Sequence, residues 1–89
     1  MSRSPVLVLY SRPGCGLCEH LEDQLHDAFG GRFRLEWRDV DRHADVRAHY
    51  AEKIPVLTTA NGEEVCCGFF DRAAVARTLE QLEAEAGAV

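Results

Sequence analysis

Residues 6–18 read VLVLYSRPGCGLC, which combines an apolar run, a Pro-Gly pair and two cysteines separated by two residues. An apolar run of about five residues bounded by turn signals is typical of a strand buried on both faces, as in a parallel sheet. After the turn the apolar period changes, because Cys18, Leu21 and Leu25 recur every three or four residues. The pattern predicts a strand over about 5–10 and a helix over about 15–28, with Cys15 at the helix start.

The predicted place of Cys15 has a chemical consequence. First-turn N–H groups of a helix lack intrahelical partners, and the helix dipole adds about half a positive charge there. Both stabilise a thiolate, so we expect the pKa of Cys15 to lie below the free-cysteine value of about 8.5. Arg12 adds a cation three residues earlier, and Cys18 lies one turn further in, on the core side. The pair therefore offers an attacking sulfur and a resolving sulfur.

A metal site is the alternative interpretation of the two cysteines, because this spacing is also half of a zinc site. A second half of similar form would then be expected. The remaining cysteines, Cys66 and Cys67, are adjacent on a predicted strand, so their side chains would point to opposite faces. A metal or Fe–S cluster module would need cysteines of two protomers, or the first pair with one of these two. The strand–turn–helix context favours redox chemistry.

The rest of the chain completes the order βαβαββα. Alternating apolar residues predict a second strand over 33–38, parallel to the first. Asp41 is the expected N-cap of a short helix through about residue 50, and Asp71 is the expected cap of the last helix. Asn61-Gly62 predicts a hairpin between strands over 54–59 and 63–67.

Residues 10–18, YSRPGCGLC, resemble the active-site segment of glutaredoxins and glutaredoxin-like proteins, in which Tyr-Ser-Lys/Arg precedes the nucleophilic cysteine by a fixed spacing. Ile54-Pro55-Val56 and the order of elements extend the resemblance over nearly the whole chain. It implies a thioredoxin-like α/β fold, a four-stranded mixed sheet with helices on both faces. It also implies a dithiol oxidoreductase of cell redox homeostasis, in which Cys15 attacks and Cys18 resolves, with glutathione as a co-substrate and no resident cofactor or metal.

The resemblance also implies binding residues. Arg12 matches the basic residue that meets a glutathione carboxylate. Pro55 takes the place of a cis proline that lies against the cysteines, and the backbone of Ile54 would then face a bound thiol peptide. Gly68 and Asp71 fall near the family's glycine pair and near the acidic residue that holds the γ-glutamyl amine.

Two departures from the family pattern bear on the electron donor. Gly16 and Leu17 stand between the cysteines in place of Pro and an aromatic residue, and Cys66-Cys67 falls near the place of the glycine pair. Either Cys66 or Cys67 could instead be a small apolar core residue or a further thiol near Cys15. We therefore expect disulfide-containing proteins as substrates, and either glutathione at low efficiency or a protein dithiol or thioredoxin-type reductase as donor.

Length, charge and cysteine usage set the remaining expectations. The 89 residues are enough for one domain, so we expect residues 1–89 to form a single glutaredoxin-like domain and a monomer. The net charge of −5 argues against nucleic acid as a partner. Only about five apolar residues follow the N-terminus, too few for a signal peptide or a membrane span. Four cysteines without an export signal indicate a cytoplasmic protein.

Overall fold

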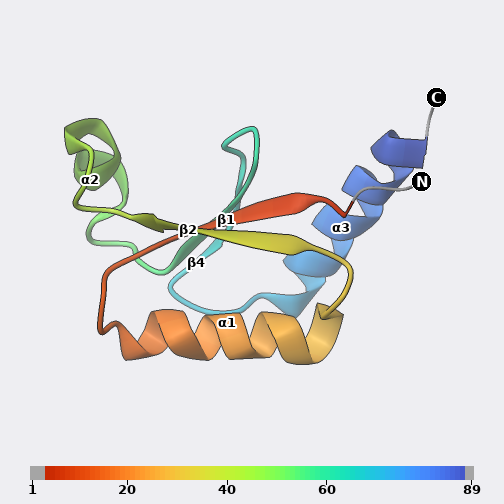
Figure 1. The fold of residues 1–89 in the computed structure, drawn as a ribbon, viewed down its shortest axis with the longest axis horizontal. Helices are drawn as coiled ribbons and strands as arrows, with labels where there is room; N and C mark the ends of the chain where they lie inside the picture. Colours follow the sequence, from red (N-terminus) through yellow and green to blue (C-terminus); the bar gives the residue numbers. More distant parts are fainter. Residues whose placement is uncertain (1–3, 88–89) are drawn as a thin grey trace.

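The computed structural model describes residues 4–87, and within them the predicted order of strands and helices is confirmed (Figure 1). The four strands form one sheet in the order β2-β1-β3-β4. β2 runs parallel to β1, whereas β3 runs antiparallel to both β1 and β4, so the sheet is mixed as expected. The elements are β1 (Val6–Ser11), α1 (Gly16–Phe29), β2 (Arg34–Asp39), α2 (Ala44–Tyr50), β3 (Val56–Thr59), β4 (Glu64–Cys67) and α3 (Arg72–Gly87).

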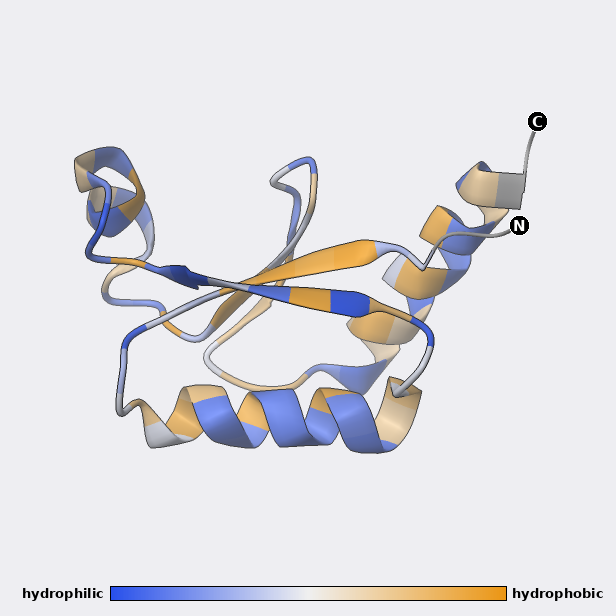
Figure 2. Ribbon diagram, viewed as in Figure 1, coloured by the Kyte–Doolittle hydropathy of each residue, from blue (hydrophilic) through white to orange (hydrophobic). Residues whose placement is uncertain are grey.

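One face of the sheet carries the apolar core. Leu7 and Leu9 of β1 point to the same side, as residues two apart in a strand do, and both are fully buried. They share the core with side chains of both α1 and α3, so these two helices cover the same face. Figure 2 shows the apolar positions of α1 interrupted by hydrophilic ones, as expected for a helix with one buried side. The helical members of the core are Leu21, Leu25, Phe29, Val75 and Leu79.

The opposite face meets α2. Tyr10 lies on that face because it alternates with Leu9, and its ring centroid is 4.9 Å from that of Tyr50 near the end of α2. No residue of α2 is buried. The predicted helices on both faces are therefore present, but the second face is held by much less apolar contact than the first.

The predicted N-cap of α2 is wrong. The cap position is taken by His43, whose side chain makes no capping hydrogen bond, and the helix begins at Ala44. Asp41 is engaged elsewhere: its carboxylate accepts from the Arg12 guanidinium, and its own N–H donates to Asp39 Oδ1 at 2.9 Å. A local capping rule failed here because a tertiary ion pair uses the carboxylate first.

Two other local predictions are confirmed. Asp71 caps α3, since the Ala74 N–H donates to Asp71 Oδ1 at 3.0 Å. The segment with Asn61 turns β3 back into β4, and the Gly62 N–H donates to the Thr59 carbonyl at 3.0 Å. Gly62 has a φ of +90°, which favours glycine at this place.

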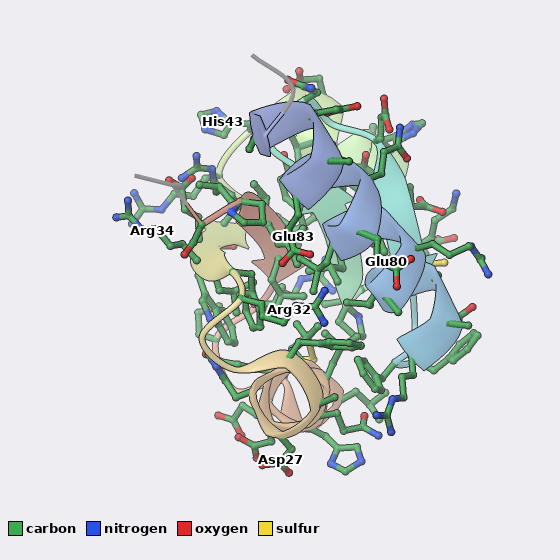
Figure 3. All side chains as sticks on the ribbon, turned by 90° about the vertical axis from the view of Figure 1, so that its right-hand side faces the viewer. Asp27, Arg32, Arg34, His43, Glu80 and Glu83 are labelled. Atoms are coloured by element: carbon green, nitrogen blue, oxygen red, sulfur yellow. A yellow bond between two sulfur atoms is a disulfide. The ribbon has the colours of Figure 1, made fainter. Side chains whose placement is uncertain are left out.

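An ion pair joins the loop after α1 to α3, and Figure 3 shows Arg32 beside Glu83. The guanidinium donates twice to the carboxylate, at 2.9 and 3.2 Å. This pair holds the pKa of Glu83 below its usual range, chiefly through the hydrogen bonds from Arg32. Among residues 4–87, the helices are all too short or too polar to cross a membrane.

Candidate redox site

A tight turn carries the chain from β1 into α1. The Cys15 N–H donates to the Arg12 carbonyl at 3.2 Å, which closes a four-residue turn around Pro13 and Gly14. Pro13 suits the second position of such a turn, and Gly14 has a φ of +79°, a conformation that favours glycine at the third. The Pro-Gly pair therefore sets the place of Cys15 relative to the end of β1.

Cys15 is the N-cap residue of α1, as the sequence predicted. Its sulfur accepts the Cys18 backbone N–H at 3.2 Å, so it satisfies one of the free donors of the first turn. The side chains of Cys15 and Cys18 are joined as a disulfide, with their Cα atoms 5.3 Å apart. Cys18 is fully buried, whereas Cys15 is only half-buried. One sulfur of the pair is thus accessible and the other is enclosed by the core.

The guanidinium of Arg12 forms an ion pair with the carboxylate of Asp41. Its Nε donates to Asp41 Oδ2 at 2.8 Å and its Nη2 to Asp41 Oδ1 at 3.2 Å. Arg47 of α2 approaches the same carboxylate at 3.5 Å. The hydrogen bonds from Arg12 first of all, and then the charges of Arg12 and Arg47, hold the pKa of Asp41 below its usual range.

Sequence reasoning missed this role of Asp41, although a signal was available. Parallel strands β1 and β2 pair up to Ser11 and Asp39, so the residues that follow them lie at the same edge of the sheet.

The Ile54–Pro55 peptide bond is cis, as predicted, and Pro55 is buried immediately before β3. The Gly68 N–H donates to the Pro55 carbonyl at 2.7 Å, so the end of β4 lies beside the start of β3. Two of the expected binding residues are therefore brought together. Asp71 is engaged in capping α3, and this accounts for one of its carboxylate oxygens.

Cys66 and Cys67 point to opposite faces of the sheet, as their adjacency predicted. Cys66 pairs with Leu57 and belongs to the apolar core, whereas half-buried Cys67 pairs with Val56. Burial raises the pKa of the Cys66 thiol. Within residues 4–87, no three His, Cys, Asp or Glu side chains gather as a metal ion would need.

Comparisons with known proteins give one matching family model and similar solved structures. The sequence pattern of the glutaredoxin-like domain family (DUF836) matches residues 6–80. The solved structure of the structural-genomics target protein XcR50 from X. campestris has a TM-score of 0.68 and 28% identity, over 84% of this chain and 96% of that one. Oxidised glutaredoxin 2 from Chlamydomonas reinhardtii has a TM-score of 0.52 and 25% identity, over 93% of this chain and 83% of that one. No match was found among curated proteins.

Proposed function

The chain belongs to the glutaredoxin-like domain family, and on this premise we propose that it is a dithiol thiol–disulfide oxidoreductase. The observation that carries the proposal is the asymmetry of its cysteine pair. Cys15 caps α1, accepts an N–H at 3.2 Å and is partly accessible, whereas Cys18 is within bonding reach and fully buried. An attacking sulfur needs access and a stabilised thiolate, and a resolving sulfur needs proximity.

The reaction begins from the reduced pair. The Cys15 thiolate attacks one sulfur of a substrate disulfide, so a Cys15–substrate bond forms as the substrate S–S bond breaks. The displaced thiolate takes a proton from water. Cys18 then loses its proton and attacks the Cys15 sulfur, which releases the second substrate thiol and forms the Cys15–Cys18 disulfide. Two electrons pass from the protein to the substrate.

The backbone supports the attacking state. A hydrogen bond from an N–H to a thiolate is stronger than one to a neutral thiol, because the acceptor is charged. The Cys18 N–H and the start of α1 therefore favour the ionised form of Cys15. Two thiols must return the electrons after each turnover, and glutathione or a protein dithiol is the donor class we propose. This chemistry suits the reducing cytoplasm and a role in redox homeostasis.

We place the substrate backbone against Ile54, Pro55 and Gly68. Gly68 is exposed, lacks a side chain and is hydrogen-bonded to Pro55, so a partner chain could approach closely there. Arg12 would meet an acidic group of the partner. Asp71, whose Oδ1 caps α3, would meet an amino group of the partner through its other carboxylate oxygen.

Trapping of the mixed disulfide tests the proposal. Reduced Cys18→Ser protein is mixed with a disulfide-bonded peptide and examined by intact-mass spectrometry without reductant. We expect one peptide-length adduct, mapped to Cys15, and we expect the wild-type protein to release two peptide thiols instead. Cys66→Ala is the matched control, because it removes a thiol that the proposal does not use, and it should behave as wild type. An adduct on Cys66 or Cys67, or none on Cys15, would contradict the assignment.

A further inference from the structure

The side of the molecule next to the Cys15 turn carries a basic groove, which we name the Arg12 groove. It has a volume of about 1030 Å³ and lies between the turn and α2. The Arg, Lys, Asp and Glu side chains that line it are Arg12, Asp41, Arg42, Arg47, Glu52 and Lys53. Cations outnumber carboxylates there by two to one, in a chain whose net charge is −5. The groove therefore carries an excess of positive charge, and what matters for an anionic ligand is whether these cations are available.

The guanidinium of Arg12, in the turn before Cys15, already binds a carboxylate. The planar guanidinium of arginine binds one carboxylate through two parallel N–H donors. Arg12 uses its Nε and Nη2 in this way on Asp41, at 2.8 and 3.2 Å. Arg47 also approaches the carboxylate, at 3.5 Å. The side chains of Arg12 and Asp41 are 40% and 42% exposed, so a small ligand can reach both.

This geometry makes a ligand carboxylate compete with Asp41 for the guanidinium of Arg12. A ligand carboxylate can take the Nε–Nη2 side of Arg12 only by displacing Asp41, so one charge-assisted hydrogen bond pair is exchanged for another. The displaced Asp41 carboxylate then stays in the same groove as the ligand and repels it. A reductant without a carboxylate does not need to displace Asp41 from Arg12.

We propose that Asp41 is a specificity-determining residue, which occupies Arg12 and disfavours small carboxylate-bearing thiols such as glutathione as reductants. This inference rests on the proposed function. The step concerned is the reduction of the Cys15–Cys18 disulfide. One thiolate attacks Cys15 and displaces the Cys18 thiolate, which takes up a proton. A second thiolate then attacks the mixed disulfide, releases Cys15 and leaves as the oxidised donor.

The experiment compares two thiols that differ in carboxylates. Oxidised wild-type and Asp41→Asn proteins are reduced under low salt by glutathione and, separately, by 2-mercaptoethanol. We expect Asp41→Asn to raise the rate with glutathione about three- to fivefold, the effect of one exposed ion pair, with the 2-mercaptoethanol rate nearly unchanged. The gain should shrink at high salt. It should also be lost in the Arg12→Gln/Asp41→Asn double variant, because the freed fork is then absent.

Glu36→Gln provides the matched control, because Glu36 is an exposed acid paired with Arg38 at 2.7 Å outside the groove. It changes the net charge equally and should leave both rates as in wild type. Thermal unfolding of each variant checks that it is folded.

The single variant Arg12→Gln gives a second test of the inference. Because Arg12 is occupied by Asp41 in wild type, Arg12→Gln should lower the glutathione rate by less than about twofold.

Three results would overturn the inference. They are an unchanged ratio of the two rates in Asp41→Asn, an equal rise for both thiols, and a matching rise in Glu36→Gln. Failure of the proposed function would look different. The wild-type protein would then fail to form the Cys15 adduct with the disulfide peptide, whatever the ratio of the two thiol rates.

Discussion

The two faces of the sheet differ in what holds them together. On the α1 and α3 face, leucines of two strands and two helices are buried in one continuous apolar core. On the α2 face, the helix has no buried residue and its neighbourhood is a charged groove. Burial of apolar surface supplies most folding free energy. The first face therefore contributes more of the stability, although Val8 and Val56 are also buried on the second face.

The redox pair lies on the boundary between these two regions. Cys18 lies on the buried side of α1 together with Leu21 and Leu25. Cys15 lies at the start of the helix, in the turn that contains Arg12. The same helix thus encloses one sulfur and presents the other. This placement explains how neighbouring cysteines with the same chemistry acquire different access.

Truncating a core leucine gives the largest expected effect on stability. Leu25→Ala removes a fully buried side chain and leaves a cavity, so we expect a loss of about 2–5 kcal/mol in the free energy of unfolding. Val46→Ala on α2 removes a half-buried side chain and should cost less than about 1 kcal/mol. Urea unfolding measures both. Similar losses for the two variants would mean that the α2 face carries as much stability as the core.

The aromatic contact of α2 should have an intermediate effect. Tyr50→Ala removes the ring that lies 4.9 Å from Tyr10, and we expect a loss of about 1–2 kcal/mol. Tyr50→Phe keeps the ring and should be nearly neutral. Hydrogen exchange can show where the effect lies, because amides of α2 should exchange faster in Tyr50→Ala while those of α1 change little. Equal acceleration in both helices would contradict the separation of the two faces.

The smallest effect on stability is expected for the surface ion pair between Arg32 and Glu83 of α3. This effect depends on pH. The pKa of Glu83 is lowered in the folded state by Arg32, so the carboxylate stabilises the fold above its unfolded-state pKa. That contribution is lost as the pH falls through the folded-state pKa. Glu83→Gln should therefore melt slightly lower than wild type at pH 7, by about a few degrees at most, and equally at strongly acidic pH. A difference that grows on acidification would have the wrong sign.

Much of the fold could be predicted because it follows from local patterns. The change of apolar period around Pro13-Gly14 marks the strand, the turn and the helix, and adjacency alone places Cys66 and Cys67 on opposite faces. The Asp71 cap and the hairpin near Asn61 also depend on neighbours in sequence. These features need no knowledge of distant contacts.

The Arg12 groove could not be derived in the same way. Arg12 and Asp41 are 29 residues apart, and their pairing depends on the parallel register of β1 and β2. From the sequence alone, Asp41 satisfies a capping rule that the structure does not use. The carboxylate of Asp41 binds the distant Arg12 guanidinium instead of capping α2. The candidate cysteines were found because their spacing is local, and the counter-ion of Arg12 was missed because it is not.

The most direct test of the account is the pH dependence of thiol alkylation in the reduced protein. Iodoacetamide is applied across a pH series, and mass spectrometry of peptides measures the labelled fraction of each cysteine separately. The account predicts that Cys15 reacts first, with a midpoint below the free-cysteine value of about 8.5. Cys66 should react later than Cys15, because burial restricts access to its thiol and raises its pKa. A midpoint for Cys15 at or above about 8.5, or labelling of Cys15 no faster than that of Cys66, would contradict its assignment as the nucleophile.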